Sequence, residues 1–169
     1  MSNHIAQANI PRSSATFEFV SKFPKLHMPS YKVASQDLVN PKKADCLQDG
    51  ELVQVTGNSI INKIADPGTL ANFQNVYISH GKIGRTDLQA TGARPVIKET
   101  DFEFRTRLVD AGATFTEGSF AAPAVLLLGD YAGTCGLAPV TTPAAEYVAV
   151  YLKNEGDGWH LFRWQRGKV

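Results

Sequence analysis

The chain has little of several features that define whole classes of proteins. Its 169 residues include two cysteines and two methionines. The longest strongly apolar run, residues 121–128, contains a proline and is far shorter than the roughly 20 residues that cross a bilayer as a helix. The N-terminus has no basic stretch followed by an apolar one, which is the pattern of a secretory signal. We therefore expect no membrane partner and a soluble chain made in a cytoplasm.

Motifs that bind metals or phosphates are also absent. The sequence has no glycine-rich phosphate loop, no C-x-x-C, no H-E-x-x-H and no calcium loop. Its histidines stand apart, at His4, His27, His80 and His160. We therefore expect no metal ion and no cofactor. The two cysteines, Cys46 and Cys135, could pair, but two reduced thiols are the commoner state in a chain without a secretory leader.

What is present is the pattern of a β-protein. From Gly50 onwards, short alternations of apolar and polar residues are separated by turn residues, with no sustained helical stripe. Residues 101–109 alternate most clearly, with four side chains on one face: Phe102, Phe104, Thr106 and Leu108. The linker 154–158 is typical of a hairpin. The predicted strands are 51–55, 60–65, 75–80, 94–98, 101–109, 125–128, 146–153 and 159–164.

This spacing predicts a mainly β fold with two parts. Residues 45–169 are expected to form a single antiparallel β-barrel or β-sandwich of jelly-roll-like type. Residues 1–44 are expected to form an extended arm. The apolar run 125–128 predicts a strand buried on both faces, and a short helix is expected only within 68–75.

The predicted arm differs from the body in composition. It holds four of the nine prolines, which exclude a continuous helix, and six basic residues against two acidic ones. The rest of the chain carries eleven basic and fourteen acidic residues, so the net charge is +1. That small net charge makes nucleic acid an improbable partner. The aromatic residues of the arm need a surface to cover, either on its own body or on a neighbour.

The sharpest candidate for catalysis is Cys135, in the segment Gly-Thr-Cys-Gly. A cysteine flanked by glycines in a β-protein is similar to the nucleophile loop of chymotrypsin-like viral cysteine proteases. The base would then be His80 or His27, with His160 near a specificity pocket. A small buried cysteine in a turn is the commoner explanation, and the usual second glycine after the cysteine is Leu137 here.

Two further candidates rest on strands. The carboxylates Asp101 and Glu103 share a strand face, but arginines continue that face, as in ordinary pairing between strands. A glycan-binding adhesion module would use exposed aromatic side chains, for which Trp159 and Trp164 are the candidates. The alternation in residues 159–164 is more typical of a strand that closes a core or meets a partner.

The order of segments in the body resembles the β-domain decoration (cement) proteins of tailed bacteriophage heads. An opening strand at 49–53 is followed by 77–87, which ends Gly-Arg-Thr-Asp, and by the alternating strand with the sequence Phe-Glu-Phe-Arg-Thr-Arg-Leu-Val-Asp. Next come Thr-Glu-Gly-Ser at 116–119, the Thr-Cys-Gly-Leu turn at 134–137 and the strand Tyr-Val-Ala-Val at 147–150. The resemblance covers residues 49–153.

The resemblance implies a non-enzymatic virion structural protein on the capsid surface. Such proteins bind the outside of the shell and clamp neighbouring subunits of the major capsid protein, commonly as trimers at local threefold axes. The arm would then bind the partner through cations and aromatic rings, and the predicted partner-binding residues are Arg12, Phe17, Phe19, Lys22, Phe23, Lys25 and Tyr31. The glycan-binding module and the protease remain the alternatives.

Overall fold

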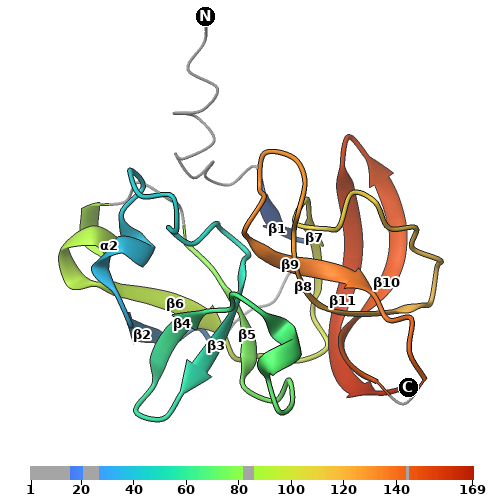
Figure 1. Cartoon of the computed structure of the whole chain (residues 1–169), viewed down its shortest axis with the longest axis horizontal. Helices are drawn as coiled ribbons and strands as arrows, with labels where there is room; N and C mark the ends of the chain where they lie inside the picture. Colours follow the sequence, from blue (N-terminus) through green and yellow to red (C-terminus); the bar gives the residue numbers. More distant parts are fainter. Residues whose placement is uncertain (1–15, 21–26, 82–85, 144) are drawn as a thin grey trace, which may run out of the picture.

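A computed structural model describes residues 16–20, 27–81, 86–143 and 145–169 of the chain. The predicted mainly β class is confirmed. The strands are divided between a closed five-stranded barrel and a six-stranded sheet, which lie side by side (Figure 1).

The barrel contains the strands β2 (Ser30–Val33), β3 (Leu52–Thr56), β4 (Ile60–Lys63), β5 (Val76–Ser79) and β6 (Ala93–Ile97). They follow the order β2-β4-β3-β5-β6, and the barrel closes where β6 pairs with β2. All pairs are antiparallel except β2 with β4. In the described residues, three short helical segments lie between barrel strands in the sequence: η1 (Gln36–Val39), η2 (Pro67–Thr69) and α2 (Thr86–Thr91).

The six-stranded sheet contains β1 (Phe17–Phe19), β7 (Glu103–Thr106), β8 (Phe120–Val125), β9 (Cys135–Pro139), β10 (Glu146–Gly156) and β11 (Trp159–Lys168). Its order is β1-β7-β11-β10-β8-β9, with antiparallel pairing throughout. The predicted hairpin joins β10 to β11. Asp157 and Gly158 at its turn have φ of 53° and 79°, as the two central residues of a type I′ turn require.

One continuous core joins the barrel to the sheet. Strand β3 shows how the alternation of side chains achieves this. Leu52 points towards the six-stranded sheet and belongs to the shared core, whereas Val53 points into the barrel. The sheet contributes stacked aromatic rings, among them Phe104 and Phe162 with centroids 5.8 Å apart. The predicted inward face of residues 101–109 is confirmed, because Phe102 and Leu108 are also buried.

The described residues of the predicted arm are built into the body. Phe17 of β1 is 2% exposed and packs in the shared core, and Val33 of β2 lies inside the barrel. Of the two surfaces proposed for the arm, this part of the chain covers its own body. Residues 1–15 and 21–26 of the arm lie outside the described residues.

Two local predictions were wrong. The run 125–128 is not a strand buried on both faces: β8 ends at Val125, and Leu127 and Leu128 are 82% and 70% exposed. A short helix was expected only within 68–75, where the structure has the 3-10 helix Pro67–Thr69, but helical segments also occur at Gln36–Val39 and Thr86–Thr91. The strand does not continue through this run because the chain turns just after it, at Gly129, which has a positive φ of 83° that glycine adopts readily.

Candidate interaction site

One buried charged side chain of the barrel, Glu51, is held in an ion pair. The carboxylate of Glu51 is fully buried, and the Lys63 ammonium lies 2.9 Å from its Oε2 atom. Burial raises the pKa of Glu51, while the neighbouring lysine acts in the opposite direction. Lys63 is the last residue of β4, and Glu51 directly precedes β3. A buried carboxylate paired in this way ties two strands together.

A second buried group surrounds Asp49. Its Oδ1 atom lies 2.9 Å from Nδ1 of His80 and accepts a hydrogen bond from the backbone N–H of Gly81 at 3.0 Å. Arg94 is 1% exposed and donates to two backbone carbonyls, those of Gln48 at 2.9 Å and Gly81 at 3.4 Å. Burial lowers the pKa of Arg94. These contacts hold loops of the barrel in place.

The cysteines are not placed as nucleophiles. Cys46 and Cys135 are free thiols that form no disulfide with each other, and both are buried, with 2% and 0% exposure. Burial raises the pKa of Cys46 to about 11 and also raises that of Cys135. A thiolate is the nucleophile in cysteine catalysis, and its formation requires a lowered pKa. Cys135 therefore has the environment of a core residue.

The two tryptophans proposed for glycan binding are buried. Trp164 is 1% exposed and Trp159 is 9% exposed. The guanidinium groups of Arg105 and Arg107 lie 4.6 and 4.8 Å from the Trp159 ring. Neither indole presents the open face that would stack on a sugar, so these residues do not form the predicted glycan site.

Of the two carboxylates that were expected to share a strand face, Glu103 is on β7 and is used in pairing between strands, whereas Asp101 precedes β7 and has a φ of 60°. Glu103 on β7 accepts a hydrogen bond from Arg163 on β11 at 3.1 Å. Arg105 on β7 donates to Glu18 on β1 at 2.9 Å through Nε. These ion pairs lie on the outer face of the sheet, where they are partly exposed.

The predicted partner-binding residues have different environments. Phe17 is a core residue, so its ring is not available to a partner in this fold. Phe19 is half-buried and packs edge-on to Phe102, with ring centroids 5.9 Å apart. Tyr31 is half-buried below the Lys98 ammonium, which is 5.4 Å from the ring centroid. The other four predicted residues lie outside the described residues: Arg12, Lys22, Phe23 and Lys25.

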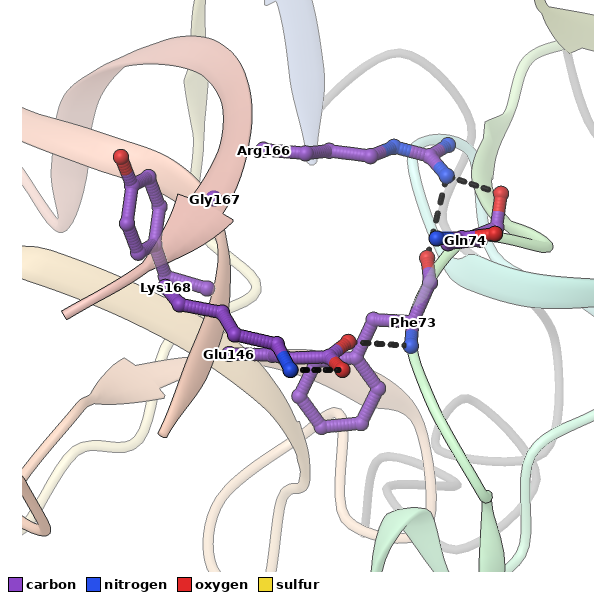
Figure 2. Close-up of a pocket in the computed structure, with 7 residues that line it drawn as sticks. Phe73, Gln74, Glu146, Arg166, Gly167 and Lys168 are labelled. Atoms are coloured by element: carbon purple, nitrogen blue, oxygen red, sulfur yellow. Dashed lines mark hydrogen bonds and ion pairs between the residues drawn. The ribbon is translucent and has the colours of Figure 1, made fainter. Parts of the chain in front are cut away.

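A hollow of about 250 Å³ lies where the C-terminal strand meets the barrel (Figure 2). Arg166 points across it and donates to the backbone carbonyls of Phe73, Gln74 and Val76, the first at 3.0 Å. Glu146 accepts a hydrogen bond from the backbone N–H of Phe73 at 2.8 Å. The polar groups of this hollow therefore bind the 73–76 segment to β10 and β11, which leaves little for a ligand.

A second hollow adjoins the first and is mainly apolar. Its volume is about 340 Å³. It shares Phe73 and Glu146 with the first hollow and extends over the start of β8 and the end of β9. Its other lining residues are Leu70, Ala71, Asn72, Ala122, Pro139, Val140, Thr141, Thr142 and Ala145.

The largest exposed apolar side chains of the described residues are at the opposite end of the same two strands. Leu127 and Leu128 lie in the loop between β8 and β9, just before its turn, and this loop projects upward in Figure 1. The base of the loop is fixed by two backbone hydrogen bonds between Leu126 and residues 133–134, at 2.8 and 2.9 Å. We define these residues, Leu127 and Leu128, as the leucine tip.

Within the described parts of the chain, no helix is long and apolar enough to span a membrane, and no three histidine, cysteine or acidic side chains converge as a metal site would require. Comparison of the chain with models of protein families, with curated proteins and with solved structures gives no match.

Neither the leucine tip nor the apolar hollow was predicted from the sequence. For the tip, the sequence did carry a signal. Gly129 directly follows three leucines, and Gly133 comes four residues later. Two glycines at that spacing indicate a turn, and therefore an end to the strand. The sequence carries no comparable signal for the hollow, because its lining residues come from three segments that are distant in the sequence.

Proposed function

We propose that this chain is a non-enzymatic virion structural protein that binds the outside of a phage capsid and stabilises contacts between subunits of the major capsid protein. It would be made in the host cytoplasm and act at the capsid surface, as a homotrimer. The observation that carries the proposal is the position of the predicted attachment residues. Arg12 precedes the edge strand β1 in the sequence, and Lys22, Phe23 and Lys25 follow it.

An attachment role fits the charge distribution along the chain. The first 44 residues carry six basic and two acidic side chains. Basic groups that flank an edge strand in the sequence favour a partner with an acidic surface. The buried ion pairs of the body serve its own stability, and the aromatic core gives it rigidity. A rigid body with an adhesive segment suits a protein that clamps neighbours, since many weak contacts on one shell combine into tight binding.

The fold also determines how the attachment segment should be removed. A deletion of residues 1–44 would take away β1 and β2, and with them core side chains such as Phe17 and Val33. A deletion of residues 1–15 spares every described strand. The shorter deletion therefore separates attachment from folding, which circular dichroism and thermal unfolding of the variant would verify.

The test is co-sedimentation with empty heads assembled from the major capsid protein of the same virus. We expect the full chain to saturate the heads. We expect both the deletion of residues 1–15 and the double variant Lys22→Glu, Lys25→Glu to bind at least about tenfold more weakly, an effect that is larger at low salt. The matched control is Lys42→Glu, Lys43→Glu, which makes the same change in charge at two exposed positions of the predicted arm.

Two results would contradict the proposal. If the full chain does not bind the heads at micromolar concentration, the capsid is not its partner. If the variants and the control bind equally well, the attachment is not made by the residues that flank β1. The second result would move the attachment surface elsewhere on the body.

A further inference from the structure

We infer that copies of this chain associate head to tail, with the leucine tip of one copy seated in the apolar hollow of the next. The inference deepens the homo-oligomeric part of the proposed function, and it rests on that proposal for its setting on a shell. The contact between copies follows from surfaces of the described chain.

The leucine tip has the form of a preorganised knob. Leu127 and Leu128 are 82% and 70% exposed, although leucine is among the residues most often buried. The loop that carries them is closed by hydrogen bonds at its base, and two further backbone bonds order the turn that follows the leucines: the N–H of Ala132 donates to Gly129, and that of Thr134 to Tyr131. A fixed loop loses little conformational entropy when it binds.

The hollow offers a matching surface. Apolar side chains and small residues make up most of its lining, and Glu146 is the charged residue among them. That carboxylate already accepts a hydrogen bond from Phe73 and lies 3.9 Å from the Lys168 ammonium. Two leucine side chains could therefore enter without removing an unpaired charge from water, which would oppose binding.

The sizes also agree. A cavity of roughly 150 Å³ lined by apolar side chains is large enough for a benzene-sized group. The hollow, at about 340 Å³, has room for about two such groups. The tip supplies two adjacent branched side chains of that size.

The positions of knob and hollow explain why a second copy is required. Strands β8 and β9 form one antiparallel ribbon in which Ala121 pairs with Pro139 at one end and Val125 with Cys135 at the other. Ala122 and Pro139 line the hollow at the first end, and the leucine tip follows β8 beyond the second end. Ala122 and Val125 are three residues apart on β8, or about 10 Å along an extended strand. The hydrogen bonds of Leu126 to residues 133–134 hold the loop at the far end, so a tip cannot reach the hollow of its own chain.

A contact between two different surfaces of the same chain is heterologous. Repetition of such a contact gives a closed ring where the rotation between copies closes, and an open filament where it does not. A ring of three copies would satisfy every tip and every hollow at a threefold axis, as the proposed function requires.

The first test uses the free protein and analytical ultracentrifugation over a wide concentration range. We expect association of the wild type, and a loss of at least about 100-fold in affinity both in Leu127→Asp, Leu128→Asp and in Ala71→Glu. Ala71 lines the hollow and is exposed outside the strands, so its substitution should leave the fold intact. The matched controls are Met28→Asp, at an exposed apolar side chain, and Ala65→Glu, at an exposed loop position; both should associate like the wild type.

The second test is a mixture of the two defective variants. The Ala71→Glu chain keeps a working tip, and the Leu127→Asp, Leu128→Asp chain keeps a working hollow. We expect the mixture to form heterodimers that grow no further, because each pair can make one contact. Contact between two tips would give a different result, in which Ala71→Glu associates normally and the mixture forms no heterodimer, and this would overturn the inference.

A wild type that stays monomeric up to about 1 mM would also overturn the inference. The failure of the proposed function has a separate signature. If the wild type associates through tip and hollow but does not bind heads in the co-sedimentation assay, the capsid proposal fails and the contact between copies stands. If the monomeric variants bind heads as well as an associating wild type, the contact is not needed for attachment.

Discussion

The backbone N–H of Leu137 on β9 donates a hydrogen bond of 2.9 Å to the carbonyl oxygen of Leu108, in the segment that follows β7. The next residue, Val109, forms a parallel bridge with Leu137. These contacts connect the last strand of the six-stranded sheet to the continuation of its second strand. The sheet therefore curls round its aromatic core, and one edge of β9 is partly covered.

The first prediction concerns the glycine beside this contact. A Cβ atom on Gly136 would overlap the carbonyl oxygen of Leu108 and lie 2.7 Å from its carbonyl carbon. Because the opposing atoms are backbone, Gly136→Ala should lower the free energy of unfolding by about 1–3 kcal/mol, as expected for overpacking in a core. Urea denaturation measures the change. The control is Gly57→Ala, where a Cβ would meet nothing within 4 Å; a similar loss in both variants would contradict the prediction.

The second prediction concerns the buried ion pair of the barrel. Lys63→Met leaves the carboxylate of Glu51 buried and unpaired, and we expect a loss of about 3 kcal/mol in stability near neutral pH. Glu51→Gln in the same chain should recover much of that loss, because the uncompensated charge is then absent. Urea denaturation of the single and double variants measures both effects. If the second substitution adds a further loss, the charge is not the cause.

The same pair gives a dependence on pH. The pKa of Glu51 in the fold is raised above its ordinary value of 4.5 by burial, so the folded state holds its proton more tightly than the unfolded state. This group therefore contributes more stability at low pH, and that contribution declines as the pH rises from about 4.5 through the folded pKa. Lys63→Met removes the partner that lowers this pKa, so its deficit against the wild type should be larger at about pH 8 than at about pH 5. An equal deficit at both values would contradict the assignment.

The third prediction concerns the thiols. With a pKa of about 11 instead of 9.0, Cys46 holds about 100-fold less thiolate at neutral pH than an ordinary thiol, and its burial blocks access as well. Cys135 is also buried, with a raised pKa. We expect neither thiol of the native protein to react with Ellman's reagent within minutes, and both to react in denaturant. Rapid labelling of native Cys135 would return the protease to consideration.

The fourth prediction concerns the hydrogen bonds of Arg166 in the hollow of Figure 2. Arg166 donates to three backbone carbonyls of the 73–76 segment, a pattern that needs the planar fork of a guanidinium. Arg166→Lys keeps the charge and loses most of these bonds, so stability should fall by about 2 kcal/mol. Arg163→Lys is the control, because its guanidinium is exposed and bonds to one carboxylate; there we expect about 0.5 kcal/mol or less. Equal losses at the two positions would show that the carbonyl contacts contribute little.

Local patterns of the sequence were sufficient for several elements. The alternation from Phe102 to Leu108 determines which face of that segment is buried, since successive side chains of a strand point to opposite sides. The segment 154–158 determines a hairpin, because Asp157 and Gly158 adopt the positive φ that such a turn needs. In these cases the signal and the structure lie within the same few residues.

Burial of an apolar run depends on more than its hydrophobicity. Residues 125–128 have the composition of a core strand, yet the chain turns after them and Leu127 and Leu128 project outward. In the same way, the aromatic residues of the N-terminal segment required a surface, and the pairing of Phe17 with Thr106, 89 residues later, placed that surface on the body itself. No local pattern contains such a pairing.

The sequence by itself determined that the chain is mainly β, where most strands lie, and which face of β7 is buried and which is exposed. These features follow from side-chain alternation and turn residues. The tertiary structure alone decided that the strands form a barrel and a sheet with one shared core, and that residues 16–20 and 27–44 belong to them. It also placed the leucine tip and the apolar hollow at opposite ends of one ribbon. Such relationships depend on contacts between segments that are far apart in the chain, which local propensities do not specify.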